Sequence, residues 1–373
     1  MIYDSEVPDQ DLAYCKEVHG EVSRTFDLAL DNLSGPLEDA ISVSYLMCRI
    51  PDTVEDSSVI PSEQQVELLN QYEGILNGSD EQIDEFVLSA LDYRNEALNA
   101  GEDEAYWDLL ENTERVFNVF ESFDEDVKRY ATDNIGDMTE GMKEICARSE
   151  EGIRIHDRDE FEQYCFYVAG TVGNLLTDLF VHQGDFDPET EQNLREYAED
   201  FGEGLQTVNI IKDVKQDYLE EDAIFLPEAV LQDNNASQSQ LQAMFEGEDV
   251  DSELFEDAMQ EMVFRSKQNM EKASRYIQNL PEDAEDIRRW AMTPYLLAVA
   301  TLREAEERSL EPLEEEGVKI SKNEALTITE KVDRWESENS IEEITELVYN
   351  EEQTSLKNSI KLSAKDALDR IKG

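Results

Sequence analysis

Two groups of acidic residues are spaced so that their carboxylates could bind a metal ion together. Asp52, Glu55 and Asp56 stand at positions i, i+3 and i+4, which in a helix places three carboxylates on one face. Asp213 and Asp217 repeat the arrangement at i and i+4. Carboxylate oxygens are the ligands that hard cations such as Mg²⁺ prefer. The spacing therefore indicates two candidate metal-binding groups.

Spacing alone does not separate these clusters from chance. With 90 acidic residues among 373, the first pattern is expected about five times at random and the second about twenty, so a solvated acidic helix face is the ordinary explanation. Position favours a site. Each cluster directly follows a stretch without acidic residues, and a cation precedes each, Arg49 in one and Lys212 in the other. We expect facing walls of a polar pocket that binds Mg²⁺ with a phosphate.

The charge balance excludes some partners. The 90 acidic and 31 basic residues give a formal net charge of −59. Such a charge repels nucleic acid and anionic lipid, and it strains a compact fold at low ionic strength. We therefore predict no nucleic-acid partner and an adaptation to a high-salt interior.

Cysteine usage and hydropathy bear on location. The four cysteines are widely spaced and form no CxxC pair, as is usual for reduced core thiols, so we expect a cytoplasmic protein. Residues 1–10 are acidic, and no stretch approaches 18 uninterrupted apolar residues. We expect no transmembrane segment and at most peripheral contact with a membrane during product release.

Four stretches without Asp or Glu indicate the elements that must position these residues. Charged side chains are rarely buried, so in an acidic chain such stretches predict buried helices. They are Ala40–Pro51, Gln163–Thr177, Leu205–Lys212 and Ile287–Arg303. Acidic amphipathic segments such as Ser62–Leu76 and Glu253–Leu280 are expected as outer helices. The chain is predicted to be all-α, with a catalytic helical domain over 1–305 and a C-terminal extension over 306–373.

Four motifs resemble the successive signatures of squalene synthases, and the wider squalene/phytoene synthase family shares most of them. They are VSRTF (22–26), YLMCRIPDTVED (45–56), YCFYVAGTVG (164–173) and LQTVNIIKDVKQD (205–217). The resemblance covers about residues 10–345. It implies an isoprenoid-synthase-type helical bundle around a central cavity, in which two farnesyl diphosphates condense head to head through a cyclopropyl diphosphate.

The resemblance also implies roles for individual residues. The two acidic clusters would bind Mg²⁺ ions that bridge to diphosphate, and nearby cations would stabilise the leaving group. The residues implied to contact diphosphate or substrate are Arg24, Arg49, Lys212, Tyr167, Gln206 and Asn209. The aromatic residues implied to act in catalysis or to line the cavity are Phe26, Tyr45, Tyr164 and Trp290. Without the motifs, ordinary core packing or a satisfied buried amide would explain each uncharged member of these sets.

A C-terminal segment indicates a second, reductive step. VKISKNEA (318–325) resembles the lysine-containing motif of squalene synthases that phytoene synthases lack. The resemblance implies that Lys319 contacts NADPH phosphate. The other residues implied to bind the cofactor are Ser321, Arg24, Arg49, Asn209 and Lys212. A loop of ion-paired lysines is the alternative explanation. The segment IFLPEAV (224–230) reads more like phytoene synthases. We therefore predict squalene formation from two farnesyl diphosphates with NADPH; the alternatives are a phytoene or dehydrosqualene synthase without reductant and a non-catalytic acidic helical protein.

Three positions depart from the family pattern. Pro51 precedes Asp52 and removes a helical hydrogen bond to Met47, so we expect an interruption or kink that shifts the first cluster. Lys212 stands where arginine is usual, and Ser321 stands at a commonly basic position. The histidines carry no ligand spacing and are expected in exposed or structural roles; they are His19, His156 and His182.

Overall fold

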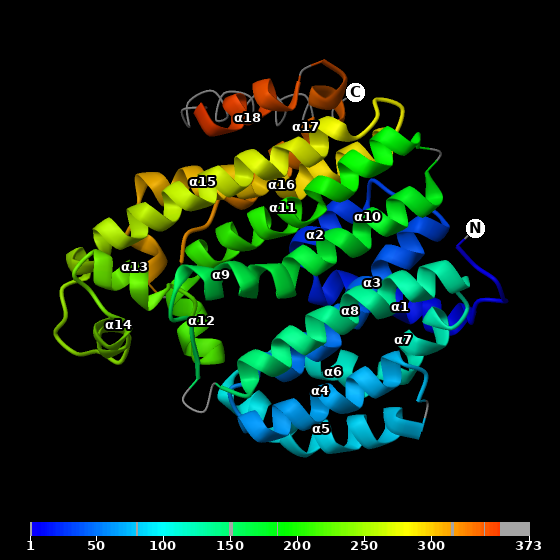
Figure 1. Cartoon of the computed structure of the whole chain (residues 1–373), viewed down its shortest axis with the longest axis horizontal. Coiled ribbons are helices and arrows are strands. Elements are labelled where there is room, and N and C mark those ends of the chain that lie inside the picture. The colour runs from blue at the N-terminus through cyan, green and yellow to red at the C-terminus, as the bar shows by residue number, and fades with distance from the viewer. Residues whose placement is uncertain are drawn as a thin grey trace, which may run out of the picture.

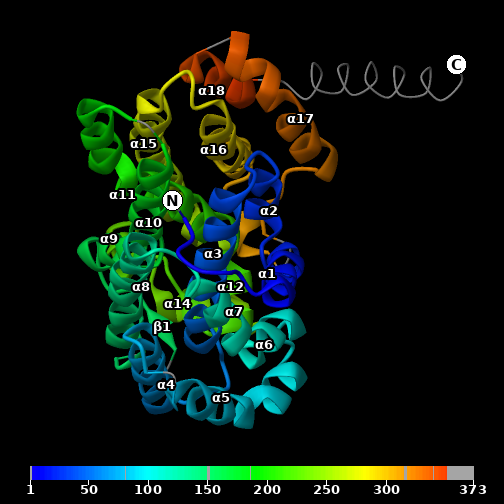
Figure 2. The same cartoon turned by 90° about the vertical axis from the view of Figure 1, so that its right-hand side faces the viewer.

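The computed structural model describes residues 2–79, 81–148, 152–184, 186–314, 317–338 and 340–350, without the side chains at 24, 25, 27, 81, 82 and 333–338. The all-α prediction is confirmed, because helices form all the layers seen in Figures 1 and 2. The described residues contain one short parallel strand pair, β1 (Ile153–Arg154) with β2 (Ala223–Ile224).

The first part of the chain forms the blue and cyan layers of Figure 1. Its helices are α1 (Asp9–Val22), α2 (Arg24–Leu30), α3 (Pro36–Glu55), α4 (Ser62–Leu76), α5 (Glu81–Ala100), α6 (Glu104–Glu111), α7 (Thr113–Phe120) and α8 (Glu125–Cys146). Helix α4 packs against α3, α5 and α8. It therefore lies directly beside the helix that carries the first acidic cluster.

The second part surrounds one long central helix. Its elements are α9 (Arg158–Cys165), a π-helical turn η1 (Phe166–Gly170), α10 (Thr171–Gln183), α11 (Pro188–Lys212), α12 (Val214–Glu221), α13 (Glu228–Asp233), α14 (Gln238–Phe245), a 3-10 turn η2 (Ser252–Phe255), α15 (Glu256–Asn279) and α16 (Glu285–Glu307). Helix α11 packs against α10, η1, α15 and α16, and Figure 1 shows it between them. The four acid-free stretches all lie in helices, as predicted.

Two glycines let the backbones of α11 and the η1–α10 stretch touch. A Cβ on Gly202 would lie 2.0 Å from the carbonyl oxygen of Ala169, and one on Gly173 would lie 2.1 Å from that of Ala198. Only a residue without a side chain allows this approach. Because the two segments run antiparallel, the contact brings Tyr164, near the end of α9, close to the carboxyl end of α11.

The apolar stretch through α9 and α10 is mostly covered by protein. By length and composition, Arg158–Gln183 could cross a membrane, but 56% of its apolar window is buried. Neighbouring helices α8 and α11 contact it. All four cysteines are free and buried, as expected for core thiols.

The C-terminal segment crosses the outer side of α16. It contains a 3-10 turn η3 (Glu311–Leu313), α17 (Lys322–Glu338) and α18 (Ile341–Asn350). Both α17 and α18 pack on α16, and α18 also contacts α15, as the upper part of Figure 1 shows. The division of the chain near residue 305 stays a prediction, and α16 itself runs on to Glu307.

The expected interruption at Pro51 does not occur. Helix α3 continues through Pro51 to Glu55. Proline does deprive the Met47 carbonyl of its helical N–H partner, but the hydroxyl of Tyr72 on α4 donates a hydrogen bond to that carbonyl at 2.5 Å. A residue of another helix therefore supplies the missing donor, and the helix reaches the first cluster.

Candidate active site between two acidic walls

The first wall, defined as Arg49, Asp52, Glu55 and Asp56, forms the last turns of α3. The Arg49 guanidinium lies between two carboxylates, with Nη1 at 3.6 Å from Asp52 Oδ2 and 3.5 Å from Asp56 Oδ2. It also covers the ring of Tyr106 on α6, 5.0 Å from the ring centroid. Glu55 is 4% exposed, and its Oε1 has no hydrogen-bond partner among the described residues. The predicted cluster and its cation thus lie together.

The second wall, defined as Lys212, Asp213 and Asp217, lies where α11 passes into α12. Asp213 separates the two helices with φ −119° and ψ 21°. The Lys212 ammonium pairs with Oδ2 of Asp213. The other oxygen, Asp213 Oδ1, is buried and accepts no hydrogen bond from the residues that the structure describes. Asp217 follows one turn later on α12.

Charges of the two walls influence each other. Burial raises the pKa of Asp56 to about 7, and Asp52 adds to the rise. Burial also raises the pKa of Asp217 to about 8, and the charge of Asp56 contributes to that rise. Charges shift each other's pKa in this way only at short range. Asp56 and Asp217, far apart in sequence, therefore lie close enough for their charges to interact.

Glu221 and Tyr164 are buried near the carboxylates of the walls. Burial raises the pKa of Glu221 well above its usual range, and the charges of Asp56 and Asp217 add to the rise. Burial likewise raises the pKa of Tyr164, and Glu55 and Asp56 are its largest charged contributors. The Tyr164 phenol therefore stays protonated beside the carboxylates, where it can donate a hydrogen bond.

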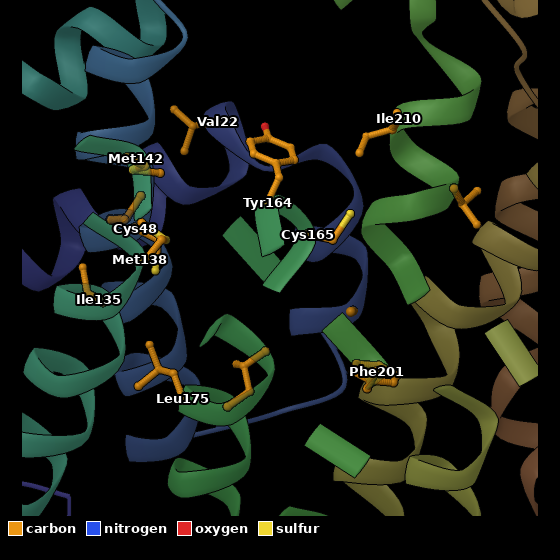
Figure 3. Packing of buried hydrophobic residues seen from close by; sticks show 14 of the residues in the cluster. Val22, Cys48, Ile135, Met138, Met142, Tyr164, Cys165, Leu175, Phe201 and Ile210 are labelled. Carbon is orange, nitrogen blue, oxygen red and sulfur yellow. The ribbon is translucent and has the colours of Figure 1, made fainter. Parts of the chain in front are cut away.

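Packing fixes the Tyr164 ring. Its plane stacks on Phe225, with ring centroids 4.6 Å apart and 22° between the planes. Phe225 directly follows β2, whose pairing with β1 holds it in place. Figure 3 shows the Tyr164 ring rising from its helix toward the space between Val22 and Ile210. The ring is thus held against a segment far from it in sequence.

The unpartnered carboxylate oxygens suit Mg²⁺ that is shared with a ligand. Glu55 Oε1 and Asp213 Oδ1 are both buried without a donor, and a buried polar atom without a partner is costly unless something else binds it. Within the described ranges, no three His, Cys, Asp or Glu side chains converge closely enough to hold a metal ion. The walls therefore suit ions whose remaining ligands are phosphate oxygens or water.

The C-terminal extension reaches the second wall. The Val318 N–H donates to the carbonyl of Lys212 at 2.9 Å, and the charge of Lys319 contributes to a lowering of the Lys212 pKa to about 8, which burial dominates. Lys319 is exposed. Ser321 is placed differently, because its Oγ accepts from the N–H of Glu324 and caps the start of α17.

Three predicted aromatic residues line one apolar cavity next to the first wall. Phe26 lies 5.7 Å from Tyr45 and 6.1 Å from Trp290 between ring centroids. The Tyr45 hydroxyl donates to the carbonyl of Val22. The cavity is also lined by aliphatic residues of α2, α3 and α10. Since Tyr45 precedes Arg49 by one turn of α3, the apolar cavity adjoins the first wall.

Other predicted residues lie elsewhere or are not placed. The Tyr167 ring faces α8, where it covers Gly141. Gln206 is half-buried and Asn209 is exposed, and no hydrogen bond of either side chain is seen within the described part of the chain. The side chain of Arg24 lies outside the described residues.

Sequence reasoning missed several residues. Glu221 stands one turn after Asp217, but that spacing is too common in this chain to be informative. Tyr106 carries no motif. His19 is fully buried in the apolar cavity, with its ring 4.8 Å from that of Tyr45; the apolar residues near it in sequence were the only signal.

Comparison with known proteins identifies relatives. The sequence model described as squalene/phytoene synthase matches residues 19–324. Botryococcus squalene synthase of Botryococcus braunii is 31% identical over 215 residues, which cover 58% of this chain and 42% of that protein. Squalene synthase ERG9 of Candida albicans is 28% identical over 229 residues, covering 60% of this chain and 47% of that protein. The matched region thus spans less than half of these relatives.

Solved structures share the fold. A TcSQS complex with the ligand BPH1237 superposes with a TM-score of 0.71 at 19% identity, covering 94% of this chain and 99% of that one. A dehydrosqualene synthase complex gives a TM-score of 0.57 at 18% identity, covering 88% and 96%. At these identities the likeness establishes the helical fold.

Proposed function

The chain belongs to the squalene/phytoene synthase family, and from that premise we propose that it condenses two farnesyl diphosphates head to head through a cyclopropyl diphosphate and reduces the product to squalene with NADPH. The two facing acidic walls support the condensation. The extension that reaches the second wall supports the reduction.

The walls would hold Mg²⁺ through Asp52, Glu55, Asp56, Asp213 and Asp217. When bound, Mg²⁺ would stabilise the negative charge that develops on the departing diphosphate. Glu55 Oε1 and Asp213 Oδ1 have the free lone pairs that this requires.

Cations and a phenol of the chain would act on the same diphosphate. Arg49 already lies between Asp52 and Asp56 and can turn its remaining N–H groups to phosphate oxygens. Lys212 offers a compact positive charge from the opposite wall. Tyr164, protonated and held against Phe225, can donate a hydrogen bond to an anionic oxygen between the walls.

The apolar cavity measures about 20 Å³ as it stands, so its lining would have to part before a prenyl chain could enter and water be kept from the allylic cation. Phe26, Tyr45 and Trp290 present aromatic rings there, and a π face stabilises a nearby cation. Exclusion of water protects such a cation from capture as an alcohol.

The observation that carries the reductive step is the contact between Val318 and Lys212. It ties the segment with Lys319 to the diphosphate-binding wall, where a second cation can meet the phosphates of a dinucleotide. The alternative is a synthase of the phytoene or dehydrosqualene type without reductant. The sequence IFLPEAV (224–230), which reads more like phytoene synthases, supports this alternative.

Product analysis separates these functions. The full chain in concentrated KCl is given labelled farnesyl diphosphate and Mg²⁺, with and without NADPH. Squalene that forms only with NADPH supports the proposal, and a polyene formed equally without it supports the alternative. If the folded protein forms neither, it is a non-catalytic acidic protein. Asp52→Asn and Asp213→Asn should each lower turnover by about 100-fold or more; near-normal turnover in either would refute the metal assignment.

A further inference from the structure

Two side chains of α4 contact backbone carbonyls just before the first wall and at its end. The Tyr72 hydroxyl donates to the carbonyl of Met47 at 2.5 Å. The Gln65 Nε2 lies 3.0, 2.7 and 3.3 Å from the carbonyl oxygens at positions 54, 55 and 57, which share its two N–H donors. Tyr72 is 0% and Gln65 7% exposed. Because they stand seven residues apart, both point from the same face of α4.

These carbonyls need donors for two different reasons. Met47 loses its helical partner because Pro51 has no N–H. The carbonyls at 54 and 55 belong to the last turn of α3, whose C=O groups have no partner in the helix. The N–H of Ser58, which could have served the carbonyl at 54, instead donates to Glu102 at 3.1 Å. Gln65 and Tyr72 thus satisfy the acceptors that this helix leaves open.

The first wall begins just after the Tyr72 contact and ends at the Gln65 contacts. Residues 49 to 56 follow Met47 and precede Ser57, so their path is set by contacts at both ends. A helix with an internal proline can bend at that residue. Any bend would change the distance from Asp52 and Asp56 to the carboxylates across the pocket.

We propose that Tyr72 and Gln65 are positioning residues. They hold the first wall at the distance from the second wall that shared binding of Mg²⁺ and diphosphate requires. Tyr72 compensates specifically for Pro51. The inference rests on the proposed function for its consequence in catalysis. The structural part of the inference, the coupling of Tyr72 to Pro51, is independent of the proposed function.

The chain offers a variant that removes only the hydroxyl. In Tyr72→Phe the ring keeps its neighbours Phe86 and Phe117, whose centroids lie 5.6 and 5.9 Å away. The Met47 carbonyl is then left without a donor. In Pro51→Ala, the new N–H can bond to that carbonyl and make the hydroxyl dispensable.

A double-mutant cycle tests the coupling with two measurements. The first is the unfolding equilibrium constant in denaturant. The second is the Mg²⁺ concentration at the midpoint of thermal stabilisation with inorganic diphosphate. When residue 51 is proline, Tyr72→Phe should raise both the unfolding constant and the Mg²⁺ midpoint about tenfold, as expected for one lost buried hydrogen bond. In the Pro51→Ala background it should raise them less than about twofold. Equal effects in both backgrounds would overturn the assignment.

Two further variants distinguish positioning from general stability. Tyr276→Phe is the matched control. The Tyr276 hydroxyl accepts from Thr177 at 2.9 Å and is buried on α15, which carries neither wall. The substitution should raise the unfolding constant without moving the Mg²⁺ midpoint. Gln65→Met should raise the midpoint, and Pro51→Ala should not rescue it. A Mg²⁺ midpoint shifted equally by Tyr276→Phe and Tyr72→Phe would contradict a positioning role.

The two proposals fail in different ways. If the function is wrong, the wild-type protein forms no product from farnesyl diphosphate while the coupling of Tyr72 to Pro51 persists in unfolding. If the positioning role is wrong, wild type turns over and Tyr72→Phe leaves kcat and the Mg²⁺ midpoint unchanged.

Discussion

The backbone N–H of Val318 donates a hydrogen bond to the carbonyl oxygen of Lys212 at 2.9 Å. This bond joins the C-terminal extension to the last residue of the central helix α11. A carbonyl at a helix end has no helical donor of its own, so Val318 both satisfies it and brings Lys319 next to the second wall.

Gly317→Ala should detach the extension from the second wall. Gly317 has φ +58°, and a Cβ there would lie 2.4 Å from the Lys212 carbonyl oxygen. We expect a loss of more than about 2 kcal/mol in unfolding free energy, from strain and collision together. Gly247→Ala is the matched control, since it has φ +88° with no atom within 4 Å and should cost only the strain. Equal losses in chemical denaturation would show that the close contact does not exist.

Lys319→Met should raise the pKa of Lys212, which burial and the charge of Lys319 lower to about 8. Removal of a nearby positive charge favours the protonated ammonium, so the alkaline limb of the rate profile should move to higher pH. The KM for NADPH should rise about tenfold, as for one lost charged contact. Lys319→Arg should preserve both properties, and Lys322→Met serves as the neighbouring control. An unchanged NADPH dependence in Lys319→Met would rule out the cofactor contact.

Mg²⁺ should stabilise the protein more at pH 8.5 than at pH 6. The pKa values of Asp56 and Asp217 are raised to about 7 and about 8, whereas unfolded carboxylates titrate near 4. Between these values the metal-free folded state holds more protons than the unfolded state, so its stability falls as pH rises from about 4 to 8. Mg²⁺ competes with those protons. Melting temperatures with and without Mg²⁺ test this, and a pH-independent Mg²⁺ effect would contradict it; Asp217→Asn should weaken both dependences.

Arg303→Leu should destabilise the extension. Arg303 is 7% exposed, pairs with Glu304 at 2.6 Å and Glu324 at 2.7 Å, and donates to the carbonyl of Val348 at 2.9 Å. Its loss leaves the half-buried Glu324 without this cation and the buried Glu304 with Arg308 as its remaining one, which costs about 2 kcal/mol. Arg129→Ala, which breaks an exposed pair with Asp126, should cost less than about 1 kcal/mol. Comparable losses in calorimetry would disprove the special weight of the buried network.

Folding should require concentrated salt. With a net charge of −59, self-repulsion opposes the compact state until the screening length becomes short, about 3 Å at 1 M. The unfolding free energy should therefore rise with KCl up to the molar range. A protein that stays folded and active in dilute buffer would show that the charge is compensated in another way.

The fold was largely predictable because burial of charge is so costly. In a chain with 90 acidic residues, long stretches that lack carboxylates and are rich in apolar residues indicate buried helices, and α3 and α16 confirm this. The polar stretch 234–245 also lacks carboxylates but stays partly exposed. The all-α class followed from composition and period. The strand pair β1–β2 was not predictable, because two residues in each strand leave no pattern.

The effect of Pro51 shows where local reasoning fails. The rule that proline breaks a helix is correct for the hydrogen bond to Met47, yet the helix continues because Tyr72 donates instead. No local pattern connects Met47 with Tyr72. Tyr72 belongs to an outer amphipathic helix, whose pattern of apolar residues predicts only which face is buried. Glu221 and His19 were missed for a similar reason, as their neighbours come from distant segments.

By itself, the sequence determined the helical class and the order of the family motifs, and it placed each acidic cluster at the end of a buried helix. These properties depend on residues close together in the chain. Only the tertiary structure decided that Asp56 faces Asp217, that Lys319 stands beside Lys212 and that Tyr72 supports Met47. Each of these contacts joins segments whose distance depends on helix packing and on close approaches such as that at Gly202, which no spacing along the chain can express.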